Sequence, residues 1–175
     1  RVNYFVISCA IFRTPSSGPL LRGQRKDWVI ISKVSEEFAD GVSYHDFSAA
    51  HTRTSIERSL KRLETDFIDI VLVHSDGNDL HILNDCGVYQ TLADLKKEGK
   101  IRAFGFSGKT VEGGTRALEQ GDCAMVTYNL NEQSEKYVID YAAAHGKGIL
   151  VKKSLDSGYV CLKSGLDPIR ASFTS

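Results

Sequence analysis

The segment "RSLKRLETDFIDIVLVH" (residues 58–74) joins a helical pattern to a short apolar strand that ends in a histidine. Its first half continues the run "SAAHTRTSIERSLKRLE", in which Ile56, Leu60 and Leu63 recur at the i, i+4, i+7 spacing of one helix face. Its second half, "IDIVLVH" (68–74), is a continuous β-branched run, typical of a strand that is buried on both faces. We therefore expect a helix followed by a strand of a parallel sheet.

The same alternation extends along the chain on both sides of this segment. Further apolar runs predict strands at 2–8, 28–34, 101–107, 123–129 and 148–154. Helical patterns lie between them at 88–99, 110–121 and 134–148. Strict alternation indicates βαβ units in a single domain, residues 1–175, as either a doubly wound open sheet or a (β/α) barrel. A dinucleotide-binding open sheet would normally carry GxGxxG directly after a strand, and "GFSGKTVEGG" (105–114) has the wrong spacing.

The composition excludes several classes of protein. The 22 basic and 22 acidic residues give a formal net charge of zero, so nucleic acid and anionic membranes are not expected partners. No apolar stretch approaches the roughly 20 residues that cross a bilayer, and "RVNYFVISCA" lacks the layout of a secretory signal, so we expect a cytoplasmic protein. The four cysteines form no CxxC pair, which argues against a zinc site or a disulfide framework.

Polar residues at the predicted strand ends are the candidates for chemistry, because a parallel α/β barrel places its active site at the carboxyl ends of its strands. A lysine and a histidine at the ends of adjacent strands are costly to bury unless they are used. These strand-end residues are Lys33, His74, Ser107, Tyr128, Asn129, Lys152, Lys153 and Ser154.

Two other groups of polar residues are interpreted as structural. His45 and His51 are six positions apart, which is neither i+3 nor i+4 on a helix, so we interpret them as surface histidines. The segment "SDGNDL" (75–80) resembles a calcium loop without its downstream glutamate, so Asp76, Asn78 and Asp79 are interpreted as loop and cap residues. No metal site is expected.

Two long segments, "RSLKRLETDFIDIVLVH" and "LADLKKEGKIRAFGFS" (92–107), resemble the most recognisable parts of the aldo-keto reductase family. "WVIISKV" (28–34) and "GILVKKSLDSG" (148–158) are similar to the third and seventh strands of that family. The resemblance implies a (β/α)8 barrel of the TIM type that reduces aldehydes or ketones to alcohols with NADPH. Its partners would then be a small-molecule carbonyl substrate and the cofactor.

The resemblance also implies roles for individual residues. Lys33 would tune the catalytic acid, and His74 would orient the substrate carbonyl, since hydride transfer leaves negative charge on oxygen that donors must accept. Ser107 would hold the nicotinamide carboxamide. The other cofactor-binding residues would be Asn129 and Lys153, with Ser154 and Gly158 approaching the pyrophosphate.

The chain departs from the family pattern at two catalytic positions. Val6 stands where the family has its catalytic aspartate, and Ile11 or Phe12 falls where it has its catalytic tyrosine. Neither isoleucine nor phenylalanine can donate a proton. A non-catalytic relative that binds nucleotide or serves as a scaffold is therefore the alternative to an active reductase. An unrelated (β/α) barrel enzyme would predict a glycine-rich phosphate loop, which the sequence does not contain.

The resemblance covers strands similar to the second through seventh of the family, so we expect an incomplete barrel. The first strand, the eighth strand and the final helix would then be missing, which leaves two exposed sheet edges. The expectation is that another copy of the chain covers these edges, or that the chain is the ordered part of a longer protein.

Overall fold

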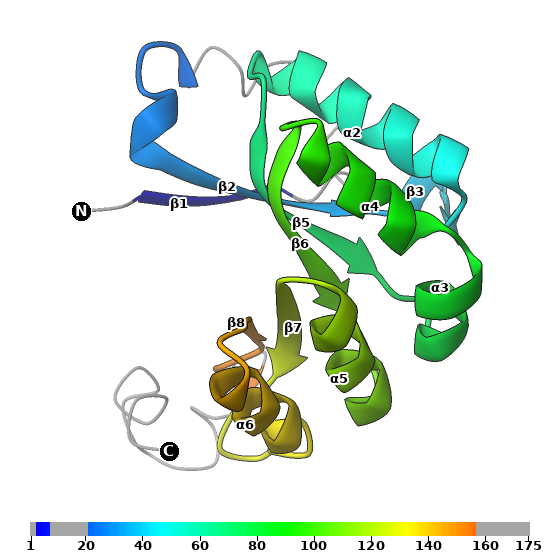
Figure 1. Ribbon diagram of the computed structural model, residues 1–175, viewed down its shortest axis with the longest axis vertical. Helices are drawn as coiled ribbons and strands as arrows, with labels where there is room; N and C mark the ends of the chain where they lie inside the picture. The colour runs from blue at the N-terminus through cyan, green and yellow to red at the C-terminus, as the bar shows by residue number, and fades with distance from the viewer. Residues whose placement is uncertain (1–2, 8–20, 157–175) are drawn as a thin grey trace.

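The chain folds as an α/β half-barrel, shown in a computed structural model that describes residues 3–7 and 21–156 (Figure 1). Six strands form one parallel sheet in the order β1-β2-β5-β6-β7-β8. Apart from an inserted hairpin, neighbours in the sheet are consecutive in the chain, so the order does not reverse as it does in a doubly wound sheet. The predicted incomplete barrel is confirmed. Its strands are β1 (Asn3–Ile7), β2 (Trp28–Val34), β5 (Ile68–His74), β6 (Ile101–Ser107), β7 (Cys123–Thr127) and β8 (Gly148–Lys152).

Helices cover the outer face of this sheet (Figure 1). The four predicted helices are present as α2 (Ala49–Leu63), α4 (Val88–Lys97), α5 (Val111–Gln120) and α6 (Lys136–Ala144), and a short 3-10 turn, η1 (Arg25–Asp27), precedes β2. Ser48 is the N-cap residue of α2, and its side chain accepts a hydrogen bond from the backbone N–H of His51 at 3.2 Å. Thr110 caps α5 in the same way, through the N–H of Gly113 at 3.1 Å.

The central run of strand β5, Ile70–Val73, is apolar because both of its faces are covered. Val71 and Val73 belong to the main core, which also contains Ile56 of α2 and Leu92 of α4. Leu72 points the other way and joins a second cluster with residues of β2 and β7. The continuous apolar run in the sequence therefore reflects a layer of helices on one side and the barrel interior on the other.

Asp69 of β5 fixes the positions of the neighbouring strands. Its carboxylate is 8% exposed and accepts hydrogen bonds from Arg25 Nη2 at 2.7 Å, Ile30 N at 2.9 Å and Arg102 Nη1 at 3.1 Å. The two guanidinium groups lie 4.0 Å and 3.9 Å from the ring centroid of Phe67. The buried Asp69 carboxylate thus links η1, β2 and β6 to the start of β5. His74 lies at the other end of the same strand.

Two elements were not predicted. Strands β3 (Glu36–Ala39) and β4 (Val42–His45) form an antiparallel hairpin after β2, and α3 (Asp79–Asp85) follows β5. Asp79 is the first residue of α3 and is 2% exposed, so its interpretation as a loop residue was wrong. Its carboxylate accepts from the backbone N–H groups of Lys109 at 2.9 Å and Thr110 at 2.8 Å, which ties α3 to the start of α5.

Two expectations from composition can be compared with the part of the chain that the structure describes. None of the helices there is long and apolar enough to span a bilayer. Cys86 and Cys123 are free thiols, and Cys9 and Cys161 lie outside the described residues.

Candidate active site

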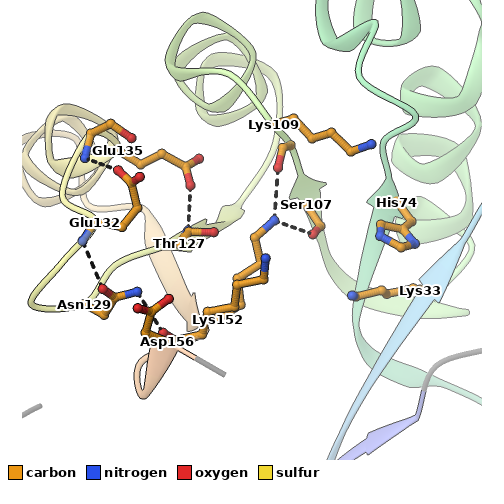
Figure 2. Close-up of a pocket in the computed structure, with 13 residues that line it drawn as sticks. Lys33, His74, Ser107, Lys109, Thr127, Asn129, Glu132, Glu135, Lys152 and Asp156 are labelled. Carbon is orange, nitrogen blue, oxygen red and sulfur yellow. Dashed lines mark hydrogen bonds between the residues drawn. The ribbon is translucent and has the colours of Figure 1, made fainter. Parts of the chain in front are cut away.

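A cavity of about 710 Å³ lies at the carboxyl ends of the strands (Figure 2). Five consecutive strands of the sheet contribute a residue at or next to their last position: Lys33 of β2, His74 of β5, Ser107 of β6, Thr127 of β7 and Lys152 of β8. The loops that follow the strands supply the remaining lining residues: Gly108, Lys109, Asn129, Glu132, Ser134, Glu135, Lys153 and Asp156. The volume is within the usual range of about 300–1,000 Å³ for small-molecule sites.

Lys33 and His74 lie close enough to influence each other's charge. Burial lowers the pKa of Lys33, while Glu36 opposes the shift. Burial also lowers the pKa of His74, the Lys33 ammonium lowers it further, and Glu36 again acts in the opposite direction. Figure 2 shows the Lys33 side chain reaching into the cavity beside the imidazole. The site therefore favours a neutral His74 near a partly desolvated lysine.

Glu36 holds His74 in place from the hairpin. Its Oε2 is hydrogen-bonded to Nδ1 of His74, and its Oε1 accepts from the Ser43 hydroxyl at 2.7 Å. The hydrogen bond from Ser43 is the main reason that the pKa of Glu36 is lowered, so the carboxylate stays ionised beside the imidazole. Sequence reasoning missed Glu36, because it did not predict the hairpin that carries it.

Lys152 crosses the cavity toward β6. Its Nζ donates to the backbone carbonyl of Gly108 at 3.0 Å and to Ser107 Oγ at 3.4 Å, as Figure 2 shows. Burial lowers the pKa of Lys152. Ser107 is 1% exposed and lines the cavity. Lys152 was among the strand-end residues that the sequence predicted as candidates. The resemblance, however, assigned cofactor binding to its neighbour Lys153 and not to Lys152.

Asn129 shapes the cavity wall by joining two loops. Its Nδ2 donates to the Lys153 carbonyl at 3.0 Å, and its Oδ1 accepts from the N–H groups of Asn131 and Glu132, both at 2.9 Å. Lys153 has a left-handed backbone, with φ at 55°, and its side chain is exposed at the cavity rim. Ser154 is exposed and is not part of the lining, so the structure does not bring it together with the other predicted residues.

The remaining predicted positions lie mostly outside the described residues. Gly158, Ile11 and Phe12 are in this group. Val6 belongs to β1, where its backbone pairs with Ile31 of β2. None of the described residues that line the cavity is a tyrosine.

The two histidines interpreted as surface residues are partly exposed, and each also lies close to another side chain. His45 ends β4 and lies beside His74, with 6.1 Å between the ring centroids. The side chain of His51 is 16% exposed and approaches Glu37, with 3.6 Å from Nε2 to Oε1. Their spacing of six residues was compared with helix periodicity, but that comparison requires both residues to be on one helix. His45 is on strand β4, and His51 is on α2.

Comparison with known proteins gives a consistent result. A model described as "Aldo/keto reductase family" matches residues 10–169. A Pseudomonas aeruginosa protein assigned to the aldo-keto reductases has a crystal structure that is 64% identical, with a TM-score of 0.88 over 98% of this chain and 64% of that one. An aldo-keto reductase from Klebsiella pneumoniae, crystallised in complex with NADPH, shares the fold at 22% identity, with a TM-score of 0.67 over 94% of this chain and 56% of that one.

A curated relative is similar over much of the chain but is considerably longer. L-galactose dehydrogenase of Arabidopsis thaliana is 28% identical over 147 residues, which are 79% of this chain and 44% of the relative. The chain thus spans less than half the length of this relative.

Proposed function

The chain belongs to the aldo/keto reductase family of oxidoreductases, and from this premise we propose that it takes part in the NADPH-dependent reduction of an aldehyde or ketone to an alcohol. The observation that carries the proposal is that Lys33 and His74 lie together in one cavity with Ser107 and Lys152. These four side chains come from four different strands, so only the folded sheet brings them together.

The donor set of the cavity fits an anionic nicotinamide cofactor. Four lysines line it, Lys33, Lys109, Lys152 and Lys153, against three carboxylates. One of these carboxylates, Glu135, accepts a hydrogen bond from the N–H of Thr127 at 2.6 Å and is thereby oriented along the wall. Ammonium groups suit phosphates, and the buried Ser107 hydroxyl suits a carboxamide. When bound, the cofactor would supply the hydride.

The chain's own residues would then act on the carbonyl oxygen. Negative charge develops there as the carbon is reduced, and preorganised donors stabilise it. The His74 imidazole donates its Nδ1–H to Glu36, so its other ring nitrogen would donate to that oxygen only in the protonated ring, the form that Glu36 favours. The Lys33 ammonium, next to it, would add positive charge within the same desolvated space.

The alternative is a relative that binds nucleotide, or serves as a scaffold, without turnover. It is favoured by Val6, and by Ile11 or Phe12, which by resemblance fall at the positions of the family's catalytic aspartate and tyrosine. Loss of a positioned general acid costs about 10²- to 10⁴-fold in rate, but it leaves the side chains that would contact the cofactor unchanged. An active reductase and a nucleotide-binding relative therefore differ in turnover and agree on NADPH binding, which a scaffold does not require.

One experiment separates them. NADPH is titrated by fluorescence, and turnover of 4-nitrobenzaldehyde is then followed with saturating NADPH. We expect Lys152→Met to weaken NADPH binding about tenfold or more, because it removes a charge-assisted contact. His74→Gln should lower turnover with little effect on NADPH binding, and His81→Ala on α3 is the surface control. Binding without turnover favours a nucleotide-binding relative, and absence of NADPH binding contradicts the reductase and leaves only a scaffold role.

A further inference from the structure

Three metal-binding side chains converge beside the cavity. Glu36, His45 and His74 each offer one ligand atom, and these atoms all lie within 4.8 Å of one another. Glu36 and His45 are paired directly across the β3–β4 hairpin, so their side chains project from the same face. His74 comes from the end of β5, in a different part of the sequence, and faces them.

We propose that Glu36, His45 and His74 form a binding site for a divalent transition metal ion of the Zn²⁺ class. Two imidazoles and one carboxylate are a donor set that such ions prefer, and three protein ligands leave a fourth position for water. All three residues are partly exposed, so an ion can reach them from solvent. This proposal goes beyond the reductase function and does not depend on it.

The geometry requires only small movements of side chains. Ligand atoms around a tetrahedral zinc ion with bonds of about 2.0–2.1 Å are roughly 3.3 Å apart. The hydrogen bond between Glu36 Oε2 and His74 Nδ1 would open to admit the ion, and His45 would move toward it. Both movements would be rotations about side-chain torsions, because each of the three residues lies on a strand.

Neighbouring groups support the site. Ser43 donates its hydroxyl to Glu36 Oε1 at 2.7 Å, which orients the carboxylate and leaves Oε2 directed at His74. Metal-binding carboxylates commonly have such outer partners. The ring of His45 stacks against Phe47, with 5.7 Å between centroids, which restricts the orientation of the imidazole. The Lys33 ammonium opposes a second cation nearby, so the ionised Glu36 is essential to the charge balance.

A bound ion would compete with the proposed role of His74. Once Nδ1 of His74 coordinates the ion, it can no longer donate to Glu36, so the hydrogen bond that orients the imidazole is lost. Zinc binding would therefore change the catalytic side of the cavity, while Lys152 and Ser107 lie on strands β8 and β6 and are not among the ligands.

Metal titration tests the site without any reference to turnover. ZnCl₂ is titrated calorimetrically into the metal-free chain, and CoCl₂ binding is followed by its visible spectrum. We expect one ion per chain, and at least about tenfold weaker binding in His45→Ala and in Glu36→Gln. His81→Ala is the matched control, because His81 pairs with Asp85 on the exposed side of α3, and this variant should bind zinc as the wild type does. Far-ultraviolet circular dichroism checks that each variant is folded.

Several results would overturn the proposal. Absence of binding would do so, as would binding that His45→Ala and Glu36→Gln leave unchanged. A thiolate-to-cobalt charge-transfer band would also overturn it, because that band reports cysteine ligation, whereas the proposed ligands contain no sulfur. A Ser43→Ala variant adds a finer test, since loss of an outer partner should weaken binding about tenfold without removing a ligand.

Discussion

At Gly105, strand β6 lies so close to β7 that no side chain fits between them. A Cβ at this position would be 2.0 Å from the Cys123 carbonyl oxygen and 2.6 Å from its Sγ. The oxygen belongs to the backbone, so a rotamer change cannot relieve the clash. Contact at 3.4 Å requires a displacement of about 1.4 Å, so we expect Gly105→Ala to separate the two strands.

The energetic cost follows from what that displacement breaks. The pairing of β6 with β7 is short, with only Gly105 opposite Cys123 and Phe106 opposite Ala124. Beside it, Asp122 N donates to the Phe104 carbonyl at 2.9 Å, and Phe104 N donates to the Asp122 carboxylate at 3.0 Å. Two lost hydrogen bonds at about 1 kcal/mol each, with overpacking at about 1–3 kcal/mol, give a loss of roughly 3–5 kcal/mol.

Urea unfolding of Gly105→Ala and Gly99→Ala measures this cost. Gly99 is a suitable control because a Cβ there would meet nothing within 4 Å, and only its positive φ of 76° disfavours alanine. We expect the control to lose about 1 kcal/mol. With an m value of about 2 kcal/mol/M, the Gly105→Ala midpoint should fall by roughly 2 M. Equal midpoints for the two variants would refute the close-approach argument.

Three further predictions concern other parts of the molecule. Asp69→Asn should lower the free energy of unfolding by about 3 kcal/mol, because it breaks a buried charge pair, and a urea midpoint close to that of the wild type would contradict this. Iodoacetamide at pH 8 should modify Cys86 well before Cys123, whose pKa burial raises to about 12, as peptide mass spectrometry can measure. Hydrogen bonds from Arg53 and Lys100 lower the pKa of Glu98 to about 2, so its stabilising contribution is present above about pH 4.5 and is lost as the pH falls toward 2. Carbon NMR titration of that carboxyl checks the value, and Arg53→Ala should raise it.

The parallel strands could be predicted from the sequence because their residues are constrained from both sides. In β5, Val71 and Val73 face the helices, while Leu72 faces the barrel interior, so no polar residue is tolerated along the central run. These strands were therefore predicted from the length and the β-branched composition of each apolar run, and not from an alternation of polar and apolar residues. The helices were predicted from the apolar residues that recur on one face. In α4 these are Val88, Leu92 and Leu95, each of which is fully buried.

The hairpin could not be predicted by the same reasoning, because it buries little apolar surface. Phe38 is 57% exposed and Val42 is 64% exposed, so the segment carries no core pattern. A different signal was available. Asp40 and Gly41 both have positive φ, 52° and 83°, which is the two-residue Asp-Gly turn that favours a tight hairpin. Attention to turn chemistry would have predicted β3 and β4, and with them the position of Glu36.

The candidate site was predicted only as far as strand ends determine it. Lys33, His74 and Ser107 could be chosen because the carboxyl ends of adjacent parallel strands meet at one edge. The sequence could not decide whether Lys152 or Lys153 faces the cavity. Consecutive residues of a strand point to opposite faces, and the last residue of β8 could not be determined from the sequence. The strand ends at Lys152, which points into the cavity, and the backbone turns left-handed at Lys153.

Under the proposed function, cofactor binding and carbonyl chemistry depend on different parts of the sheet. Ser107 and Lys152, which would contact the cofactor, lie on β6 and β8, whereas Lys33 and His74 lie on β2 and β5. The short β6–β7 pairing separates Lys152 from the other three residues. His74→Gln on β5 should therefore change turnover while NADPH still binds. Gly105→Ala should weaken both, because displacing β7 carries β8, and hence Lys152, away from Ser107 and Gly108.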